Sequence, residues 1–211
     1  MTGQERRRTT TIALVLLAWL IAATLLGATG VLRGLGPPAP QLVLLTLTAL
    51  VVLLGLTRPG LRSWLMTVDE RLLMSVHLTR FVGIYFLVLY GRGELPFDFA
   101  VPGGWGDIVV ATLALALMLG WRAASVAGWW AYSIWNVVGL IDILFVVTTA
   151  ARLALSAPES MAALLRLPLN LLLTWLVPLI IASHVFLAVR LARRRPSGDR
   201  HGIRRARGPG P

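Results

Sequence analysis

The most regular feature of the chain is a succession of long apolar runs separated by short polar or turn-forming stretches. A helix needs about 20 mostly apolar residues to cross a bilayer, and six runs come close to that length. The pattern therefore predicts an all-α, polytopic membrane bundle with six transmembrane helices, at residues 12–32, 41–57, 72–90, 107–121, 128–150 and 168–191. Residues 1–11 would form a basic N-terminus, and residues 192–211 a basic tail that has nothing to bury and is disordered.

The first apolar run has two interpretations. Arg6, Arg7 and Arg8 precede it, and a basic segment before an apolar core also describes a signal peptide. However, the run is long enough to span a membrane, and residues 25–28 make a poor cleavage site. We therefore expect a retained first helix.

The segments between the spans carry their own signals. Gly and Pro residues at 34–40 predict a turn, so the first two spans form a helical hairpin. Before the third span, apolar residues recur at helical spacing and charged residues lie opposite them, which predicts an amphipathic helix on the cytoplasmic membrane surface. Its apolar positions are Leu61, Trp64, Leu65, Val68 and Leu72.

Two further expectations come from turn-forming residues. Residues 91–107 are dense in Gly and Pro and predict a loop, at whose end Asp107 would cap the fourth span. Pro178, in the middle of the sixth span, should kink that helix and free the carbonyl of Thr174.

Composition supports a membrane protein. Hydrophobic residues make up 57% of the chain and charged residues 14%, against about 25% charged in an average soluble domain. The formal net charge of +11 would suggest nucleic acid as a partner in a soluble protein. Here the basic residues are all Arg and lie mostly beside the apolar runs, so we expect the lipid bilayer and no nucleic acid as partner. The chain has no Cys, which excludes disulfides and thiolate metal sites.

The distribution of Arg predicts the orientation. Six spans place both termini on one side, and cytoplasmic segments of membrane proteins carry an excess of basic residues. With the termini inside, only Arg33, Arg92, Arg152 and Arg166 lie outside. We therefore expect an N-in, C-in protein of the bacterial cytoplasmic (inner) membrane, with the acidic residues Glu94 and Asp107 toward the outer face.

A small set of polar residues lies inside the predicted spans, where each ionisable group costs about 2.5–3.5 kcal/mol at the bilayer centre. At the helical rise, two of the three His residues, His77 and His184, lie at similar depth, and Arg80 shares a face with His77. Asp142 is deep and would need a partner, for which Arg80 is the obvious choice although the two lie at different depths. We call this set the polar seam, and it consists of His77, Arg80, Asn136, Asp142 and His184.

Several functions are compatible with the polar seam. The favoured hypothesis is a small transport or translocation component that handles an ion, a proton or a small solute. The first alternative is a haem-binding membrane protein with His77 and His184 as axial ligands. The second is a non-catalytic accessory or scaffold subunit, with other membrane subunits or a second copy as partners. An enzyme acting on lipids is less well supported, because no catalytic motif is present and no catalytic residue can be assigned.

Overall fold

The structure is a computed structural model, and it describes residues 3–120 and 125–194. Nine α-helices are found in these ranges: α1 (Gly3–Ala28), α2 (Val31–Gly34), α3 (Ala39–Thr57), α4 (Pro59–Thr67), α5 (Glu70–Ser75), α6 (Gly83–Gly91), α7 (Phe97–Gly120), α8 (Val126–Ser156) and α9 (Val177–Arg193). Three shorter helical segments are η1 (Val76–Val82), η2 (Pro158–Leu165) and η3 (Leu172–Leu176). The predicted tail falls mostly outside the described residues, and so does Arg122, one of the basic residues expected on the cytoplasmic side.

Six helical stretches are long and apolar enough to cross a membrane: Gly3–Ala28, Ala39–Thr57, Glu70–Gly91, Phe97–Gly120, Val126–Ser156 and Leu172–Arg193. The predicted all-α class with six long apolar helices is therefore confirmed, and the chain is a multi-pass membrane protein. Its orientation and the membrane-surface position of the segment around α4 stay predictions.

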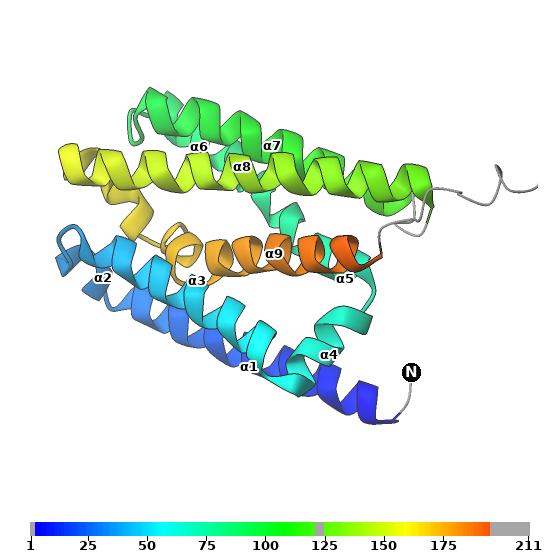
Figure 1. Cartoon of the computed structure of the whole chain (residues 1–211). Helices are drawn as coiled ribbons and strands as arrows, with labels where there is room; N and C mark the ends of the chain where they lie inside the picture. Colours follow the sequence, from blue (N-terminus) through cyan, green and yellow to red (C-terminus); the bar gives the residue numbers. More distant parts are fainter. Residues whose placement is uncertain (1–2, 121–124, 195–211) are drawn as a thin grey trace, which may run out of the picture.

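The helices form two layers with α9 between them (Figure 1). The helices α6, α7 and α8 make one layer, and α1 and α3 the other. The central helix α9 packs against α3 and α8. Half of the most apolar window of its span is buried, against 11% for α1 at the edge. The central span is thus the one with the largest share of its residues shielded from lipid.

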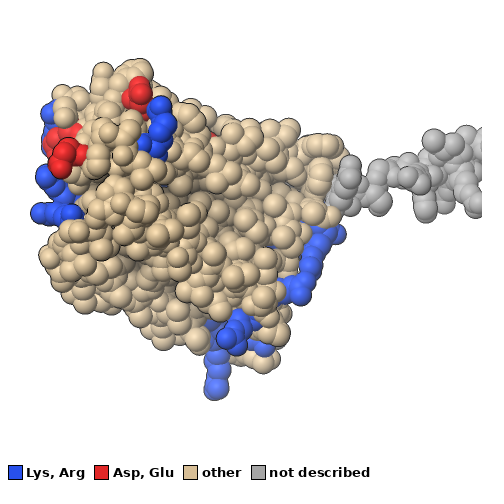
Figure 2. Space-filling model, turned by 60° about the vertical axis from the view of Figure 1, so that its left-hand side comes forward, with Lys and Arg blue, Asp and Glu red and all other residues tan. Residues whose placement is uncertain are grey.

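Charged side chains lie toward two opposite parts of the surface (Figure 2). Between them the visible face is a broad uncharged area. Exposed large apolar residues on α1, α3, α7 and α8 contribute to the apolar surface, among them Leu14, Leu45, Leu119 and Ile141. Such a surface is stable against lipid chains and would be costly in water.

The fourth span differs from the prediction at its start. The expected loop over residues 91–107 is wrong in its second half, because α7 begins at Phe97 and contains Pro102. Its glycines serve close packing rather than turns: a Cβ on Gly104 would lie 2.8 Å from the carbonyl oxygen of Gly83. Asp107 consequently does not cap a helix but lies well inside α7, and its side chain is turned to other helices.

The third and sixth spans each contain a non-α segment. In the third span the 3-10 segment η1 holds both His77 and Arg80. In the sixth span the π-helical segment η3 directly precedes α9, and Pro178 lies in the first turn of α9. A π turn is one way to accommodate the hydrogen bond that a proline removes. Segments of this kind often mark functional positions in membrane helices.

Candidate functional site

Arg80 is the most demanding residue in the bundle, because its guanidinium is buried and only 1% of the residue is exposed. Its Nε donates to Asp107 at 2.6 Å, and its Nη2 donates to Asp142. Its Nη1 donates to the backbone carbonyl of Gly139 at 3.0 Å. Every guanidinium nitrogen therefore has a partner, which is what a charge inside a membrane requires.

The 3-10 geometry of η1 explains why these groups meet. Side chains three residues apart eclipse each other in a 3-10 helix, so His77 and Arg80 lie on one side. The segment also rises about 2.0 Å per residue instead of 1.5 Å, which moves Arg80 about 2 Å further along the span toward Asp142. The sequence predicted this ion pair with a difference in depth to overcome, and η1 removes part of that difference.

Close helix contacts place the two carboxylates. A Cβ on Gly83 would lie 2.9 Å from the Cβ of Asp107, so the glycine allows η1 and α6 to approach α7. Gly106 likewise leaves room for the Asp142 carboxylate, which a Cβ at that position would overlap. With both carboxylates ionised, Asp107, Asp142 and Arg80 sum to one negative charge. We call these three residues the ion cluster.

The two histidines form a second polar group next to the ion cluster. His77 is 1% and His184 0% exposed, and their ring centroids lie 4.3 Å apart. Trp135 packs edge-on against His77 and at a tilt against His184, with ring centroids 4.8 Å and 5.4 Å away. The pair is therefore enclosed by other side chains and does not contact lipid.

Hydrogen bonds determine which nitrogen of His184 carries the hydrogen. The Asn136 amide nitrogen donates to the backbone carbonyl of His184 at 3.2 Å, so the amide oxygen faces Nδ1 of the same residue at 2.9 Å. An amide oxygen only accepts, and Nδ1 must therefore be the donor. The other nitrogen, Nε2, is then an unprotonated acceptor in the neutral ring, and it is buried without a partner.

The same reasoning applies to His77. The Ser183 hydroxyl donates to the carbonyl of Ile180 at 2.8 Å and lies 2.8 Å from Nε2 of His77. A hydroxyl has a single hydrogen, so both contacts are hydrogen bonds only when Nε2 donates to the serine. Nδ1 of His77 is then the acceptor, and it too is buried without a partner. Two lone pairs with no protein donor thus lie on neighbouring rings.

Gly139 connects the histidine pair to the ion cluster. Its carbonyl oxygen accepts from Arg80, and a Cβ at this position would lie 2.7 Å from Cε1 of His184. The glycine therefore allows the imidazole to lie directly against the turn of α8 that Arg80 holds. All five residues of the polar seam, together with Asp107, belong to one assembly, in which Asp142 alone is partly exposed.

Glu94 is not part of this assembly. It is exposed between α6 and α7, and its backbone N–H donates to the carbonyl of Leu89 at 2.9 Å. Among the described residues, the ion pairs of Arg80 are with Asp107 and Asp142 alone. The acidic side of the centre thus consists of two aspartates from α7 and α8.

The haem alternative does not fit this geometry. An iron with its macrocycle must lie between two axial imidazoles. The ring centroids of His77 and His184 lie only 4.3 Å apart, which leaves no room for an iron and its macrocycle between the imidazoles.

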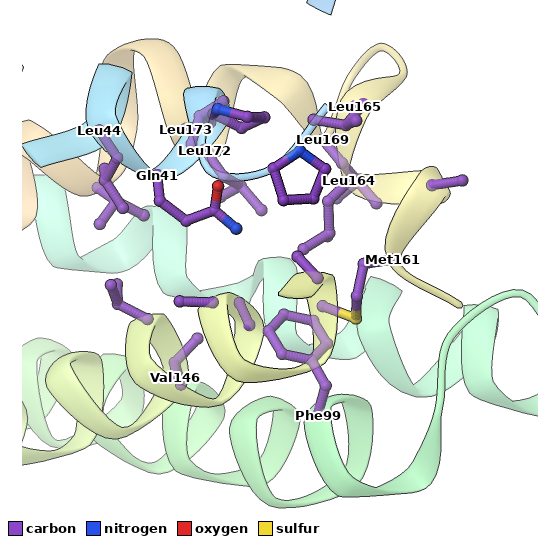
Figure 3. Close-up of a pocket in the computed structure, with 18 of the residues that line it drawn as sticks. Gln41, Leu44, Phe99, Val146, Met161, Leu164, Leu165, Leu169, Leu172 and Leu173 are labelled. Carbon is purple, nitrogen blue, oxygen red and sulfur yellow. The ribbon is translucent and has the colours of Figure 1, made fainter. Parts of the chain in front are cut away.

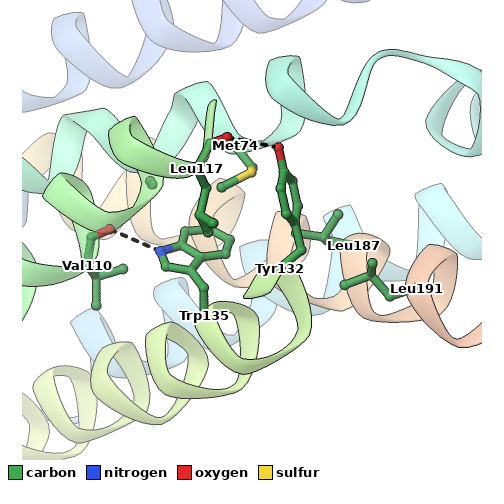
Figure 4. Packing of buried hydrophobic residues seen from close by; sticks show 8 residues of the cluster. Met74, Val110, Leu117, Tyr132, Trp135, Leu187 and Leu191 are labelled. Carbon is green, nitrogen blue, oxygen red and sulfur yellow. Dashed lines mark hydrogen bonds between the residues drawn. The ribbon is translucent and has the colours of Figure 1, made fainter. Parts of the chain in front are cut away.

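A cluster of buried apolar residues, drawn in Figure 4, meets the histidine pair at Trp135. Four of its members are closer than the histidines to the end of the bundle where α4 lies, and all four are buried: Met74, Leu117, Tyr132 and Leu187. Trp135 donates to the carbonyl of Val110 at 3.1 Å and forms the boundary between this cluster and the imidazoles. We call Met74, Leu117, Tyr132 and Leu187 the closing cluster.

Some participants were not foreseen from the sequence. Trp135 and Ser183 contact the histidines, yet an aromatic or a small hydroxyl residue in an apolar run has no distinctive signal of its own. Arg190, near the end of the sixth span, was given no role from the sequence, but it is 4% exposed and binds Glu70 at 3.0 Å and the carbonyl of Val68 at 2.6 Å. Two features of the sequence could have indicated this ion pair: Arg190 lies in the last turn of an apolar helix, and acidic residues precede the third span.

Comparison with known proteins assigns the chain to a protein family. The family model described as Domain of unknown function (DUF8737) matches residues 37–192, which include the polar seam and the last five predicted spans. No curated protein and no solved structure matches the chain.

Proposed function

The chain belongs to the DUF8737 family, and we propose that it is a small transport component of the bacterial inner membrane in which the polar seam passes a proton. The observation that supports this proposal best is the continuity of buried polar groups. Hydrogen bonds join Asp107 and Asp142 to Arg80 and Arg80 to the Gly139 carbonyl, while His184 packs against Gly139 and against His77. Buried polar groups inside a membrane are costly, and chains of Asp and His are typical of proton relays.

The chemistry of the groups favours a proton over a larger solute. Both histidines present an acceptor nitrogen without a protein donor, and this is the position at which each ring would accept a proton. The ion cluster has one negative charge in excess when both aspartates are ionised, and a proton neutralises it. The two imidazoles are packed against each other and against Trp135, and a proton needs no open passage between them.

Access to the assembly differs between its two sides. The Asp142 side chain is 17% exposed, whereas the histidines are fully enclosed. Between the histidines and the end of the bundle at α4, the closing cluster forms an apolar layer. We infer that Asp142 is the carboxylate through which protons enter, and that their release toward α4 requires the closing cluster to open.

The orientation follows from the Arg distribution, with both termini in the cytoplasm. The end of the bundle with α2, η2 and the α6–α7 connection then faces outward, and α4 with the closing cluster faces the cytoplasm. Protons would thus enter from the outer side and meet a closed inner side.

The experiment is proton flux into liposomes that contain the purified protein, driven by a valinomycin-set potassium diffusion potential and read with an enclosed pH-sensitive dye. We expect Asp142→Asn to reduce the flux to that of protein-free liposomes, because an amide can neither take up nor release the proton. Asp98→Asn is the matched control, since Asp98 is 63% exposed and pairs loosely with Arg152 at 3.7 Å.

Unchanged flux in Asp142→Asn would overturn the proposal and leave the ion cluster with the structural role expected of an accessory subunit. Gel filtration of both variants shows whether they keep the assembly state of the parent.

A further inference from the structure

A second feature of the bundle is an apolar cavity of about 660 Å³ between its two layers. The helix α3 and the η3–α9 segment form one wall, α8 forms the opposite wall, and η2 crosses the end (Figure 3). Gln41 and Leu44 face Val146 and Phe99 across the space, with Met161 and Leu164 at the η2 side. The volume lies within the range of about 300–1,000 Å³ that is typical of small-molecule sites.

The depth of the cavity matches one leaflet of a bilayer. Its lining on α8 extends from Ile143 to Ala154, a rise of about 16 Å along the helix. The hydrocarbon core of a bilayer is about 30 Å thick, so one leaflet contributes about half of that. A lipid chain that enters beside η2 would therefore reach the bottom of the cavity.

The bottom of the cavity accepts an apolar chain end although it carries charged residues. Arg80 and Asp107 line it there, but they are already engaged with each other at 2.6 Å. Apart from these two and the residues at the mouth, the lining is almost entirely apolar. A chain end in this position would cover Asp107 and leave Asp142, which does not line the cavity, as the open side of the ion cluster.

The mouth carries groups that suit an anionic head group. Arg33 from α2 and Arg166 after η2 both line it, together with Glu159, and all three are exposed. Within the described residues, neither arginine makes an ion pair. Arginine binds phosphate through two parallel hydrogen bonds, and two arginines from separate segments at one opening are well placed to do so.

Gln41 adds a second requirement at the mouth. Gln41 lines the cavity, and its Oε1 is buried and accepts no hydrogen bond in the described part of the chain. A buried acceptor without a donor is costly, and a bound hydroxyl would satisfy it. The head group that meets both demands carries a phosphate and free hydroxyl groups.

We propose that this cavity binds one chain of an anionic, hydroxyl-bearing glycerophospholipid of the phosphatidylglycerol type, with its phosphate at Arg33 and Arg166 and its head-group hydroxyl at Gln41. The site does not depend on proton passage through the polar seam. The lipid fills the space between the layers and fixes their separation next to the ion cluster.

Native mass spectrometry of the protein released from nanodiscs of equal parts phosphatidylglycerol and phosphatidylcholine tests the proposal. We expect one retained phosphatidylglycerol per chain. Arg33→Gln combined with Arg166→Gln should lower the preference for phosphatidylglycerol about thirtyfold, from the typical contribution of two arginines near anionic lipid. Arg92→Gln is the matched control, because Arg92 is exposed and does not line the cavity.

A second pair of variants tests the cavity itself. Ala150→Trp places a large side chain in the lining and should abolish retention, whereas Ala116→Trp on the exposed face of α7 should not. Equal retention in all variants would mean annular lipid only and overturn the proposal, as would the absence of bound lipid from the parent. Retention without head-group preference would overturn the assignment of Arg33 and Arg166. Parallel flux measurements on Asp142→Asn distinguish a failure of this site from a failure of the proton path.

Discussion

At the scale of single residues, the cost of burying charge and polarity explains the centre of the molecule. Arg80 uses all three nitrogens on Asp107, Asp142 and Gly139, and removing one partner of such a pair typically costs about 3–5 kcal/mol. The histidines differ, because each keeps one nitrogen free of protein partners. Every nitrogen of the Arg80 guanidinium is thus hydrogen-bonded, whereas each imidazole keeps one nitrogen that can accept.

The assignment of ring hydrogens leads to a spectroscopic prediction. In the neutral rings, His77 should carry its hydrogen on Nε2 and His184 on Nδ1, because Ser183 and Asn136 act as acceptors. Solid-state ¹⁵N spectra of the protein in bilayers distinguish the two tautomers by the shifts of the ring nitrogens. Spectra of His77→Gln and His184→Gln assign the signals, and the opposite tautomer at either ring would contradict the hydrogen-bond scheme.

The residue scale is also where sequence reasoning had mixed success. The Arg80–Asp142 pair could be anticipated, because two opposite charges in apolar runs each need a partner. Asp107 could not be assigned in the same way, since a carboxylate after a glycine-rich stretch equally well describes a helix cap. Its role depends on which helix crosses which, and that information is absent from local spacing.

At the scale of elements, glycine contacts between helices determine how the polar groups meet. Gly83 and Gly104 let η1 and α6 lie against α7 with their backbones in near contact. Small residues of this kind are the usual means by which membrane helices approach closely. The position of the Asp107 carboxylate next to Arg80 is therefore a consequence of the α6–α7 crossing.

Gly83→Ala tests this dependence. The added Cβ would meet the Gly104 carbonyl and the Cβ of Asp107, so we expect a loss of about 1–3 kcal/mol in the free energy of unfolding, as for other overpacked positions. Gly91→Ala is the control, because nothing lies within 4 Å of its Cβ. Unfolding in mixed micelles, followed by circular dichroism, measures both. Equal stability of the two variants would show that the crossing tolerates the extra methyl group.

The six long helices could be predicted from apolar run length, but the internal irregularities could not. Glycine and proline over residues 91–107 indicate a turn in a soluble context, while in α7 they lie within a helix that neighbouring helices support. The 3-10 segment η1 has no sequence signature of its own. It arises where the tertiary contacts of Arg80 outweigh the slightly better hydrogen bonds of an α-helix.

At the scale of the whole molecule, the two layers and the central α9 separate a polar interior from a lipid-facing exterior. Arg190 joins the end of α9 to Glu70 and to the carbonyls of Leu65 and Val68, which holds α4 and α5 against the bundle. The charged parts of the surface mark the two sides that would face water (Figure 2). Which of these two sides faces the cytoplasm is a prediction from the Arg distribution.

Cysteine labelling tests the orientation directly, because the chain has no Cys of its own. With both termini inside, a membrane-impermeant maleimide added to intact bacterial cells should label Glu159→Cys, in η2, and should not label Gln4→Cys, at the start of α1. Permeabilised cells should give labelling at both positions. The opposite pattern in intact cells would place the termini outside and reverse the direction of the proposed proton path.

The separation of the ion cluster along the chain has a consequence for biosynthesis. Arg80 enters the membrane before either of its acidic partners, since Asp107 follows 27 residues later and Asp142 62 residues later. At translation rates of about 5–20 residues per second, the second partner arrives about 3–12 s after Arg80. During that interval the third span carries an incompletely neutralised charge. Stable insertion of this helix is therefore coupled to synthesis of the fifth span, and the first four spans would not be expected to form a finished intermediate.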